Sequence, residues 1–452
     1  MKIATDNQTS SDSKQTLTGS AFMLRALRHK NYQLFFSGQS ISLIGTWMTR
    51  IATSWLVYRL TGSALLLGVV GFAGQIPSFL LAPFAGVLVD RWNRHRLLVA
   101  TQVLAMLQSV ALAVLAFTGL INIWQIVFLS LFQGLINAFD MPARQSFLIE
   151  LVEDKNDLPN AIALNSSMVN AARLLGPSIA GILIVWVGEA WCFMLDGISY
   201  LAVITSLLMM KIVPRALTTA KETDFVEQLR EGWNYVFGFS PIRKILFLLA
   251  IVSLVGMPYT VLMPVFANEI LHGGPYALGL LMAASGVGAL LGAVFLASRQ
   301  SVLGLGKFIP LMAGLFGAGL IAFSFSTVFW LSLLLLIVTG LGFMVQMAVS
   351  NTLLQTIVDE DKRGRVMSFY TMAFTGTVPF GSLLAGGLAE KIGAPHTLLI
   401  GGLGCLAGAL WFARSLPALR LEIQPIYIKK GILPEITAGV QNVSELSVPP
   451  QT

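Results

Sequence analysis

The chain has 452 residues, of which 55% are hydrophobic and 11% are charged. Soluble domains carry roughly a quarter charged residues, so this composition excludes an ordinary soluble protein and indicates one that crosses a membrane several times. The net charge is +7. The basic residues are spread over many loops instead of forming one patch, so nucleic acid is not an expected partner.

The N-terminal residues 1–31 are polar and rich in Ser, Thr and Gln. No basic segment leads directly into a short apolar run with a cleavage site, so no secretory signal is predicted and the segment is expected to stay in the cytoplasm. The stretch FMLRALRHKNYQLFF, which leads into the first apolar run, predicts an amphipathic helix.

Twelve apolar runs are long enough to cross a bilayer, whose core takes about 20 mostly apolar residues per helix. They form two groups of six, over residues 32–211 and 244–415. Between them, residues 212–243 include KETDFVEQLREGWNYVFGF, which predicts an amphipathic surface helix in a cytoplasmic linker. Residues 416–452 are mostly polar with several prolines, so we expect a disordered cytoplasmic tail. The expected spans are 32–59, 65–89, 97–118, 122–148, 160–187, 191–211, 244–270, 275–298, 306–326, 329–356, 366–390 and 395–415.

The lysines and arginines are distributed unevenly between the two sides of the predicted spans. Almost all fall in loops on one side; Arg59 and Lys391 fall on the other, and Arg50, Arg144 and Arg173 lie within spans. Cytoplasmic loops carry the excess of positive charge in membrane proteins. We therefore expect a multi-pass protein of the bacterial cytoplasmic (inner) membrane with both termini in the cytoplasm.

The two groups of spans repeat each other in sequence. Because each group has six spans, the repeats are parallel and their pseudo-twofold axis is expected along the membrane normal. At one constant offset Ser42, Gly45, Leu67 and Gly68 recur as Ser253, Gly256, Leu278 and Gly279, and at a slightly smaller offset Gly134, Met141 and Leu148 recur as Gly340, Met347 and Leu354.

The stretch GVLVDRWNRHRLL, residues 86–98, concentrates charges between the second and third spans. Asp90 is unfavourable at the C-terminus of its own helix, so it is expected to contact another helix N-terminus or an arginine. The pattern Gly-x-Leu-x-Asp-Arg-x-x-Arg, formed with Gly86, Arg91 and Arg94, resembles the signature loop of the major facilitator superfamily. Asn93 replaces the usual turn glycine of that pattern.

This resemblance implies a cytoplasmic latch. In the family, the loop aspartate reaches the eleventh span in the outward-open state, and a loop arginine meets an acid on the fourth span. Asp140 is the candidate acid here, with Arg144 one turn away in the same cluster. The alternative is that the arginines of the loop serve only as positive-inside anchors. The corresponding loop of the second half, around Arg299 and Lys307, lacks the aspartate, so the latch would be one-sided.

The fifth span contains NAARLLGPSIAG, with Gly176, Pro177 and Gly181. Proline frees a backbone carbonyl and small residues permit close helix contact, which suits a bending helix at the interface of the two halves. The spacing resembles the second part of the family's antiporter motif and therefore implies export. The alternative is a purely structural kink.

Arginines within spans are costly unless they are paired or face water. Arg50 and Arg173 are therefore candidates to face a central cavity and hold an anionic group or couple to a proton site. The alternative is that they pair with Asp196 or with backbone carbonyls. Drug exporters of the superfamily commonly carry an arginine on the fourth span where this chain has Ser130, so proton coupling is implied by the family alone.

The resemblance covers residues 20–415, and NAFDMPARQ and DEDKRGRVMSF are most similar to the bacterial enterobactin-exporter and macrolide-efflux branch. It implies an all-α, twelve-helix secondary transporter, active as a monomer without metal or cofactor. The expected substrate is an amphipathic small molecule, a siderophore or drug, exported against a gradient of ions, with protons as the coupling ion. The expected lining of the substrate site between the halves includes Gln39, Trp47, Tyr259, Met263, Met347 and Asn351.

Other functions receive less support from the sequence. An importer of the same fold is the closest alternative, and only the antiporter-like motif argues against it. ATP-driven transport would need a Gly-x4-Gly-Lys-Ser/Thr loop, which GLGKF at 304–308 does not complete. The four histidines show no His-Glu-x-x-His spacing, so an enzyme is not expected. A sensor would need an additional domain, which the sequence does not contain.

Overall fold

The structure is a computed structural model that describes residues 24–152, 154–211, 225–299, 303–360, 362–430 and 432. Over these ranges every regular element is helical and no strand is present. Eleven helices or interrupted helices of this part are long and apolar enough to cross a membrane. The 32-residue helix α2 (Lys30–Thr61), which carries Arg50, is long enough to supply the twelfth span. The predicted all-α membrane fold is therefore confirmed.

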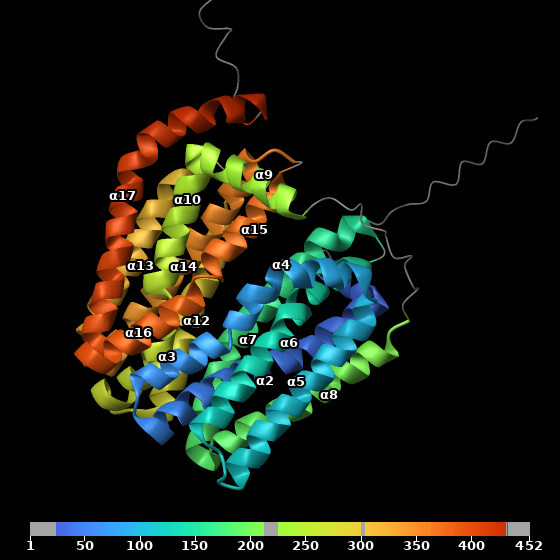
Figure 1. The fold of residues 1–452 in the computed structure, drawn as a ribbon, viewed down its shortest axis with the longest axis vertical. Helices are drawn as coiled ribbons and strands as arrows, with labels where there is room; N and C mark the ends of the chain where they lie inside the picture. Colours follow the sequence, from blue (N-terminus) through green and yellow to red (C-terminus); the bar gives the residue numbers. More distant parts are fainter. Residues whose placement is uncertain are drawn as a thin grey trace, which may run out of the picture.

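The first half is a bundle of spans that follow one another up and down (Figure 1). Its helices end where the sequence supplies suitable residues. Gly62 has φ of +61° and ends α2, because a residue without a side chain adopts this conformation readily. Asn122 and Gln125 cap each other's backbone at the start of α6, and Asn93 caps α5. The helices after α2 are α3 (Ala64–Ala73), α4 (Ile76–Arg91), α5 (Arg94–Phe117), α6 (Ile123–Glu150), α7 (Leu158–Val187) and α8 (Glu189–Met209).

The second half repeats this arrangement with more irregular helices. Its first span consists of α10 (Ser240–Ile251) and α11 (Tyr259–Val265), each followed by a short π-helical stretch. Pro258 and Pro264 cannot donate the backbone hydrogen bonds of a regular α-helix, which explains the interruption. The other helices are α12 (Gly274–Ala297), α13 (Phe308–Ser324), α14 (Phe329–Ile357), α15 (Arg363–Phe374), α16 (Val378–Ile392) and α17 (Ala394–Lys429).

The second and eleventh spans are each broken in the middle. A turn at Gly74 and Gln75 separates α3 from α4, and a turn around Gly376 separates α15 from α16. In both cases a proline stands at the start of the next helix, where its missing N–H costs nothing. The sequence predicts one continuous helix at each place, so the breaks are a correction.

Two predictions about the ends of the halves are wrong. Before the first span, the described residues form only the short 3-10 helix η1 (Arg25–Arg28), and α2 starts at Lys30. The predicted disorder from residue 416 is contradicted by α17, which continues to Lys429 and buries Leu419 and Ile423. The rest of the tail lies outside the described residues. The linker helix α9 (Phe225–Gly238) forms where an amphipathic helix is predicted.

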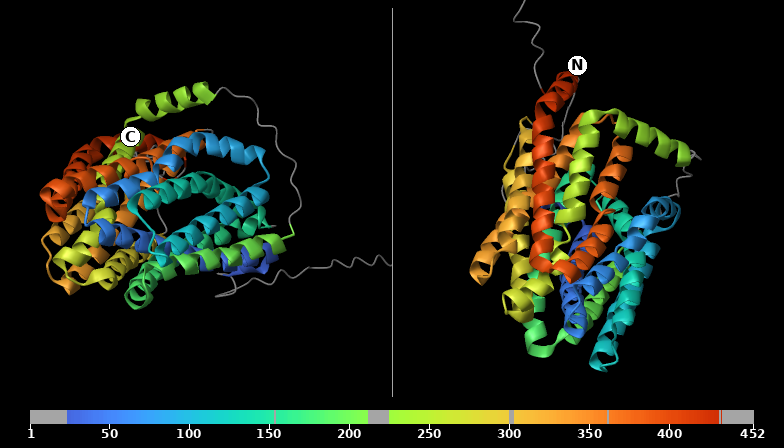
Figure 2. Two further views of the ribbon diagram at one scale, coloured as in Figure 1. Left: turned by 60° about the horizontal axis from the view of Figure 1, so that its bottom comes forward. Right: turned by 60° about the vertical axis from the view of Figure 1, so that its left-hand side comes forward.

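The two bundles converge at one end of the molecule and diverge at the other (Figures 1 and 2). At the converging end, α3 packs against α16 and α7 packs against α12. We call this end, which carries the turns at Gly62 and Gly393, the sealed end. The opposite end carries the basic turn between α4 and α5, and we call it the basic end.

Candidate substrate site and gates

Three of the predicted substrate residues meet between α2 and α7. The guanidinium carbon of Arg50 lies 4.6 Å from the centre of the Trp47 ring, and that of Arg173 lies 5.3 Å from it. Both are cation–π distances. Gly176 lets α7 approach α2 here, since a Cβ atom built on it would lie 2.4 Å from Trp47 Cβ. We call Trp47, Arg50 and Arg173 the arginine–tryptophan cluster.

The cluster carries positive charge without a compensating acid. The guanidinium groups of Arg50 and Arg173 lie over the same Trp47 ring, so their like charges repel each other. Among the residues that the structure describes, neither has a carboxylate in ion-pair contact. The Nε atom of Arg173 is buried without a hydrogen-bond partner, while Arg50 keeps an exposed surface. Two neighbouring unpaired cations within membrane spans are costly, so this arrangement is suited to holding an anion.

The second half closes the other side of the cluster. Tyr259 of α11 is buried, and its hydroxyl lies 2.6 Å from the Ser285 hydroxyl on α12. A Cβ atom built on Gly286 of α12 would lie 3.4 Å from the Arg173 carbonyl oxygen, so the backbones of α7 and α12 are close together here. The cluster therefore lies at the boundary between the halves, where the substrate site is expected.

The other predicted lining residues do not join this cluster. Gln39 is 2% exposed and Met263 is fully buried, so neither can contact a substrate in this conformation. Met347 and Asn351 are partly exposed on α14. There the Met347 carbonyl accepts a hydrogen bond from Tyr370, and Asn351 accepts one from Gln355. Their contacts place them beside α15, apart from Trp47.

Asp196, a possible partner of the arginines, has a different environment. Its side chain is 1% exposed and accepts a hydrogen bond of 2.7 Å from Ser109. In the described part of the chain no cation pairs with it, so the expected alternative of an Asp196 pair with Arg50 or Arg173 does not hold in this conformation. No group of His, Cys, Asp and Glu among the described residues could hold a metal ion.

The sealed end is closed by two glycine contacts related by the repeat. A Cβ atom on Gly68 would lie 2.5 Å from the Ser382 carbonyl oxygen, and one on Gly279 would lie 2.6 Å from the Pro177 carbonyl oxygen. Their direct partners are also close to the other half: a Cβ atom on Gly386 would lie 2.6 Å from the Ala64 carbonyl oxygen, and one on Gly181 would lie 3.0 Å from the Pro275 carbonyl oxygen. The halves touch backbone to backbone at both places. Gly181 and Pro177 of the antiporter-like motif thus lie in one of the two seams.

Acidic residues add polar contacts at the same end. Tyr58 of α2 donates a hydrogen bond to Glu269 in the second half. Glu390 accepts hydrogen bonds from the Ser63 hydroxyl at 3.0 Å and from the Leu65 N–H at 3.1 Å. Ser63 is the N-cap of α3, so a carboxylate from the other half lies at the positive end of that helix. These contacts stabilise the closed arrangement of the sealed end.

At the basic end, the span-four acids pair differently from the prediction. Asp140 is 4% exposed, forms an ion pair with Arg144, and accepts hydrogen bonds from Thr101 and Gln102. Arg94 reaches Glu150 instead, at 2.5 Å. The reason is distance along the helix: Glu150 is the last residue of α6 and lies roughly 15 Å beyond Asp140.

The remaining latch residues are placed only in part. Gly86 and Asp90 belong to α4, but their side-chain environments lie outside the described residues. Arg91 is exposed, and the neighbouring Trp92 stacks on Phe139 at a ring distance of 6.3 Å.

Sequence reasoning missed the acids Glu150, Glu269 and Glu390. Each stands at the end of a span, where charge is expected for solvation alone. The sequence repeat could have pointed to Glu269, because contacts on a pseudo-twofold axis join equivalent residues of the two halves. Tyr58 and Glu269 are such a pair of equivalent residues.

Comparison with known proteins gives one family and several relatives. The family model described as transmembrane secretion effector, a division of the major facilitator superfamily, matches residues 21–425. The staphyloferrin A transporter of Staphylococcus aureus is 26% identical over 86% of this chain and 97% of its own length. Macrolide efflux protein A of Streptococcus pyogenes is 22% identical over 83% of this chain and 94% of its own length. The multidrug efflux pump Tap of Mycolicibacterium fortuitum is 26% identical over 85% of this chain and 92% of its own length.

Solved structures agree with this fold. The nucleoside transporter NupG has a TM-score of 0.66 at 13% identity and covers 86% of this chain and 98% of its own. A bacterial homologue of the human lysosomal transporter Spinster has a TM-score of 0.62 at 14% identity and covers 91% of this chain and 99% of its own. The relatives are transporters and not enzymes, and the fold is theirs. The chain is a member of the transmembrane secretion effector family of the major facilitator superfamily.

Proposed function

We propose that this transporter exports an amphipathic small molecule that carries anionic groups, a siderophore or a drug, by alternating access driven by an ion gradient. The observation that carries the proposal is the arginine–tryptophan cluster. Two unpaired guanidinium groups beside an indole offer charge to carboxylate or catecholate groups and an aromatic face to an apolar part. The names of the relatives, a staphyloferrin A transporter and two efflux proteins, support the same substrate class.

The orientation follows from the distribution of charge. The basic end faces the cytoplasm of a bacterial inner membrane, with both termini on that side, because positive loops are retained there. In the present conformation the halves are in contact at the sealed end, so the structure corresponds to a state that receives substrate from the cytoplasm. Export then requires the seams of the sealed end to separate while the basic end closes.

Closure of the basic end is where the signature loop acts. Asp90 reaches the second half only in the outward-open state, while Arg94 stays bound to Glu150 within the first half. The Asp140–Arg144 pair lies further inside the first half, on α6. The resemblance to the family makes the proton the coupling ion of this proposal. The transporter works as a monomer in it, because each half supplies one wall of a single site.

Removal of the cationic charges tests the substrate class. Arg50→Gln and Arg173→Gln should each abolish transport of carboxylate-bearing substrates while uncharged amphipathic substrates are still moved. Arg59→Gln is the matched control, since Arg59 lies on the same helix but is paired with Glu189 at the sealed end. The assay is uptake into inverted vesicles and efflux from preloaded right-side-out vesicles. Unchanged transport of anionic substrates in both cluster variants would remove the proposed role of these residues.

The direction of transport and its energy source need a separate measurement. An uncoupler should stop efflux from preloaded cells while ATP remains available. Accumulation of substrate inside right-side-out vesicles under a proton gradient would identify the protein as an importer instead. Efflux that continues without any ion gradient would contradict secondary active transport.

A further inference from the structure

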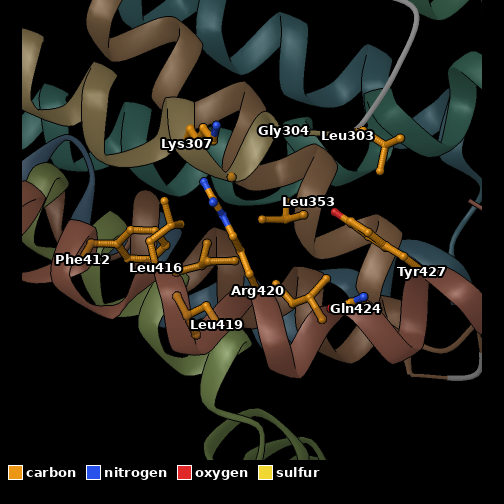
Figure 3. Close-up of a pocket in the computed structure, with 13 residues that line it drawn as sticks. Leu303, Gly304, Lys307, Leu353, Phe412, Leu416, Leu419, Arg420, Gln424 and Tyr427 are labelled. Atoms are coloured by element: carbon orange, nitrogen blue, oxygen red, sulfur yellow. The ribbon is translucent and has the colours of Figure 1, made fainter. Parts of the chain in front are cut away.

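A second site lies outside the boundary between the halves, under the C-terminal part of α17. A pocket of about 320 Å³ opens there between α17, α10, α14 and the 3-10 turn η5 (Leu305–Lys307). Figure 3 shows Arg420 extending from α17 across this pocket toward Lys307. The part of α17 that forms one wall is the segment that continues helically beyond the predicted end of the last span.

The pocket combines an apolar interior with a basic rim. Its inner wall includes Phe412 and Leu419, which are 1% and 2% exposed. Lys307 and Arg420 are exposed at the rim. In the described part of the chain neither of these two cations has a carboxylate in ion-pair contact. The pocket is thus suited to a ligand with an apolar chain and an anionic head.

The depth of the pocket matches the membrane surface. The turn η5 directly precedes α13, so Lys307 stands where a span begins at the basic end. On the outside of α17, Trp411 is half-exposed and packs on Phe247 at a ring distance of 5.3 Å. Exposed Trp side chains gather at the level of lipid headgroups. Arg420 lies nine residues, roughly 13 Å, beyond Trp411 on α17 toward the basic end, so a phosphate between Lys307 and Arg420 would lie further out than this tryptophan, toward the aqueous side.

We propose that this pocket binds one anionic phospholipid of the leaflet at the basic end. Its phosphate lies between Lys307 and Arg420, and part of one acyl chain packs against Phe412, Leu416 and Leu419. Basic pockets between spans on this side of a membrane favour anionic headgroups. The bound lipid fixes the extension of α17 against the second half, and this binding is independent of the transported substrate.

Native mass spectrometry of the full chain in detergent tests the proposal. Phosphatidylglycerol should be retained as one molecule per protein, and phosphatidylcholine with the same acyl chains should be lost. Lys307→Gln with Arg420→Gln should weaken phosphatidylglycerol binding roughly 25-fold, since each basic residue near the surface contributes a factor of about five. Arg414→Gln with Lys429→Gln is the matched control, because these exposed residues of α17 do not line the pocket.

Three further measurements exclude other occupants. Leu416→Trp fills the apolar part and should weaken lipid binding without removing the basic rim. Inorganic phosphate should not displace phosphatidylglycerol; full displacement would show that the site takes free phosphate. A chain that ends at residue 432 should bind the lipid as the full chain does. Stronger binding after this truncation, or equal binding of both lipids, would overturn the proposal.

Discussion

The two halves share one fold but distribute their charges differently. On α6, Asp140 and Arg144 form an ion pair. At the equivalent positions of α14, set by the repeat that pairs Gly134 with Gly340, stand Gln346 and Ser350. These two form a neutral hydrogen bond of 3.4 Å and are both buried. The same packing position thus needs a polar pair in each half, but only the first half uses charge.

This difference extends to the rest of the membrane interior. Arg50, Arg173 and Asp196 also belong to the first half, whereas α11, α12, α13 and α14 contain no charged residue. Buried charge is expensive and is retained where it serves a function. We infer that the first half carries the electrostatic part of transport and that the second half supplies a neutral wall with Tyr259 and Ser285.

The largest expected effect comes from breaking the charged pair. Asp140→Ala leaves Arg144 without its partner; because the Arg144 side chain keeps 26% of its surface exposed, the loss should lie at the lower end of the about 3–5 kcal/mol of a fully buried pair. Gln346→Ala, the matched change in the second half, removes a neutral hydrogen bond and costs about 1–3 kcal/mol. Thermal unfolding of the detergent-solubilised protein, followed by size-exclusion chromatography, measures both. Equal losses would mean that the two pairs are equivalent.

Copying the neutral pair into the first half separates stability from function. The double variant Asp140→Gln with Arg144→Ser places the α14 residues on α6, so no unpaired charge remains. We expect most of the folded yield to return while transport stays low. If transport also returns, the charge on α6 has only a structural role.

The sequence predicted the parts of the structure that depend on periodicity and repetition. Gly68 and Gly279 are equivalent in the repeat, and both lie in inter-half seams. Hydropathy could not show which side of a span faces its neighbours, because lipid and protein core favour the same apolar residues. That is why Met263 was expected to line the site and is instead fully buried.

Other features needed contacts that no local pattern contains. Proline usually ends helices, yet α17 continues through Pro417 because Leu419 and Ile423 are buried against the second half. Arg94 pairs with Glu150 and not with Asp140, and this choice depends on how far α5 and α6 are shifted along their axes relative to each other. Such offsets between helices arise only from tertiary packing.

The next prediction concerns the one-sided latch. Asp90→Asn keeps the shape of the side chain but removes the charge proposed to stabilise the outward-open state. A charge-assisted hydrogen bond contributes about 1.5–3 kcal/mol, so the balance should shift roughly tenfold or more toward the present state. Transport should fall while substrate binding from the basic end persists. Arg299→Gln, in the corresponding second-half loop, should have no such effect; a fully active Asp90→Asn protein would leave the loop charges with an orienting role alone.

The seams of the sealed end should respond symmetrically. Gly68→Val and Gly279→Val each place a side chain against a carbonyl oxygen of the opposite half. Overpacking of this kind costs about 1–3 kcal/mol and destabilises only the state in which the seams are closed. Both variants should therefore expose the arginine–tryptophan cluster to reagents added at the sealed end, measured by labelling of a cysteine at Trp47. Gly238→Val, at the end of α9, is the control, because a Cβ atom there meets nothing within 4 Å and its φ lies outside the left-handed region. A response in one variant alone would contradict the symmetry.

The smallest expected effect concerns Glu390, where the two seams differ. Glu390 lies one turn beyond Gly386 on α16 and accepts hydrogen bonds at the start of α3. The equivalent residue of the other seam, one turn beyond Gly181, is Val185, which is exposed and cannot accept hydrogen bonds through its side chain.

Because Glu390 is also exposed, its interaction with the α3 N-terminus should contribute only about 0.3–1 kcal/mol. Glu390→Gln should thus increase opening of the sealed end about two- to fivefold, measured as the population of spin-label distances between residues 60 and 391, and high salt should reduce the difference between parent and variant. Val185→Glu should not stabilise the opposite seam by more than this amount. A larger effect of Glu390→Gln than of Gly68→Val would mean that the acid, and not backbone packing, holds the sealed end closed.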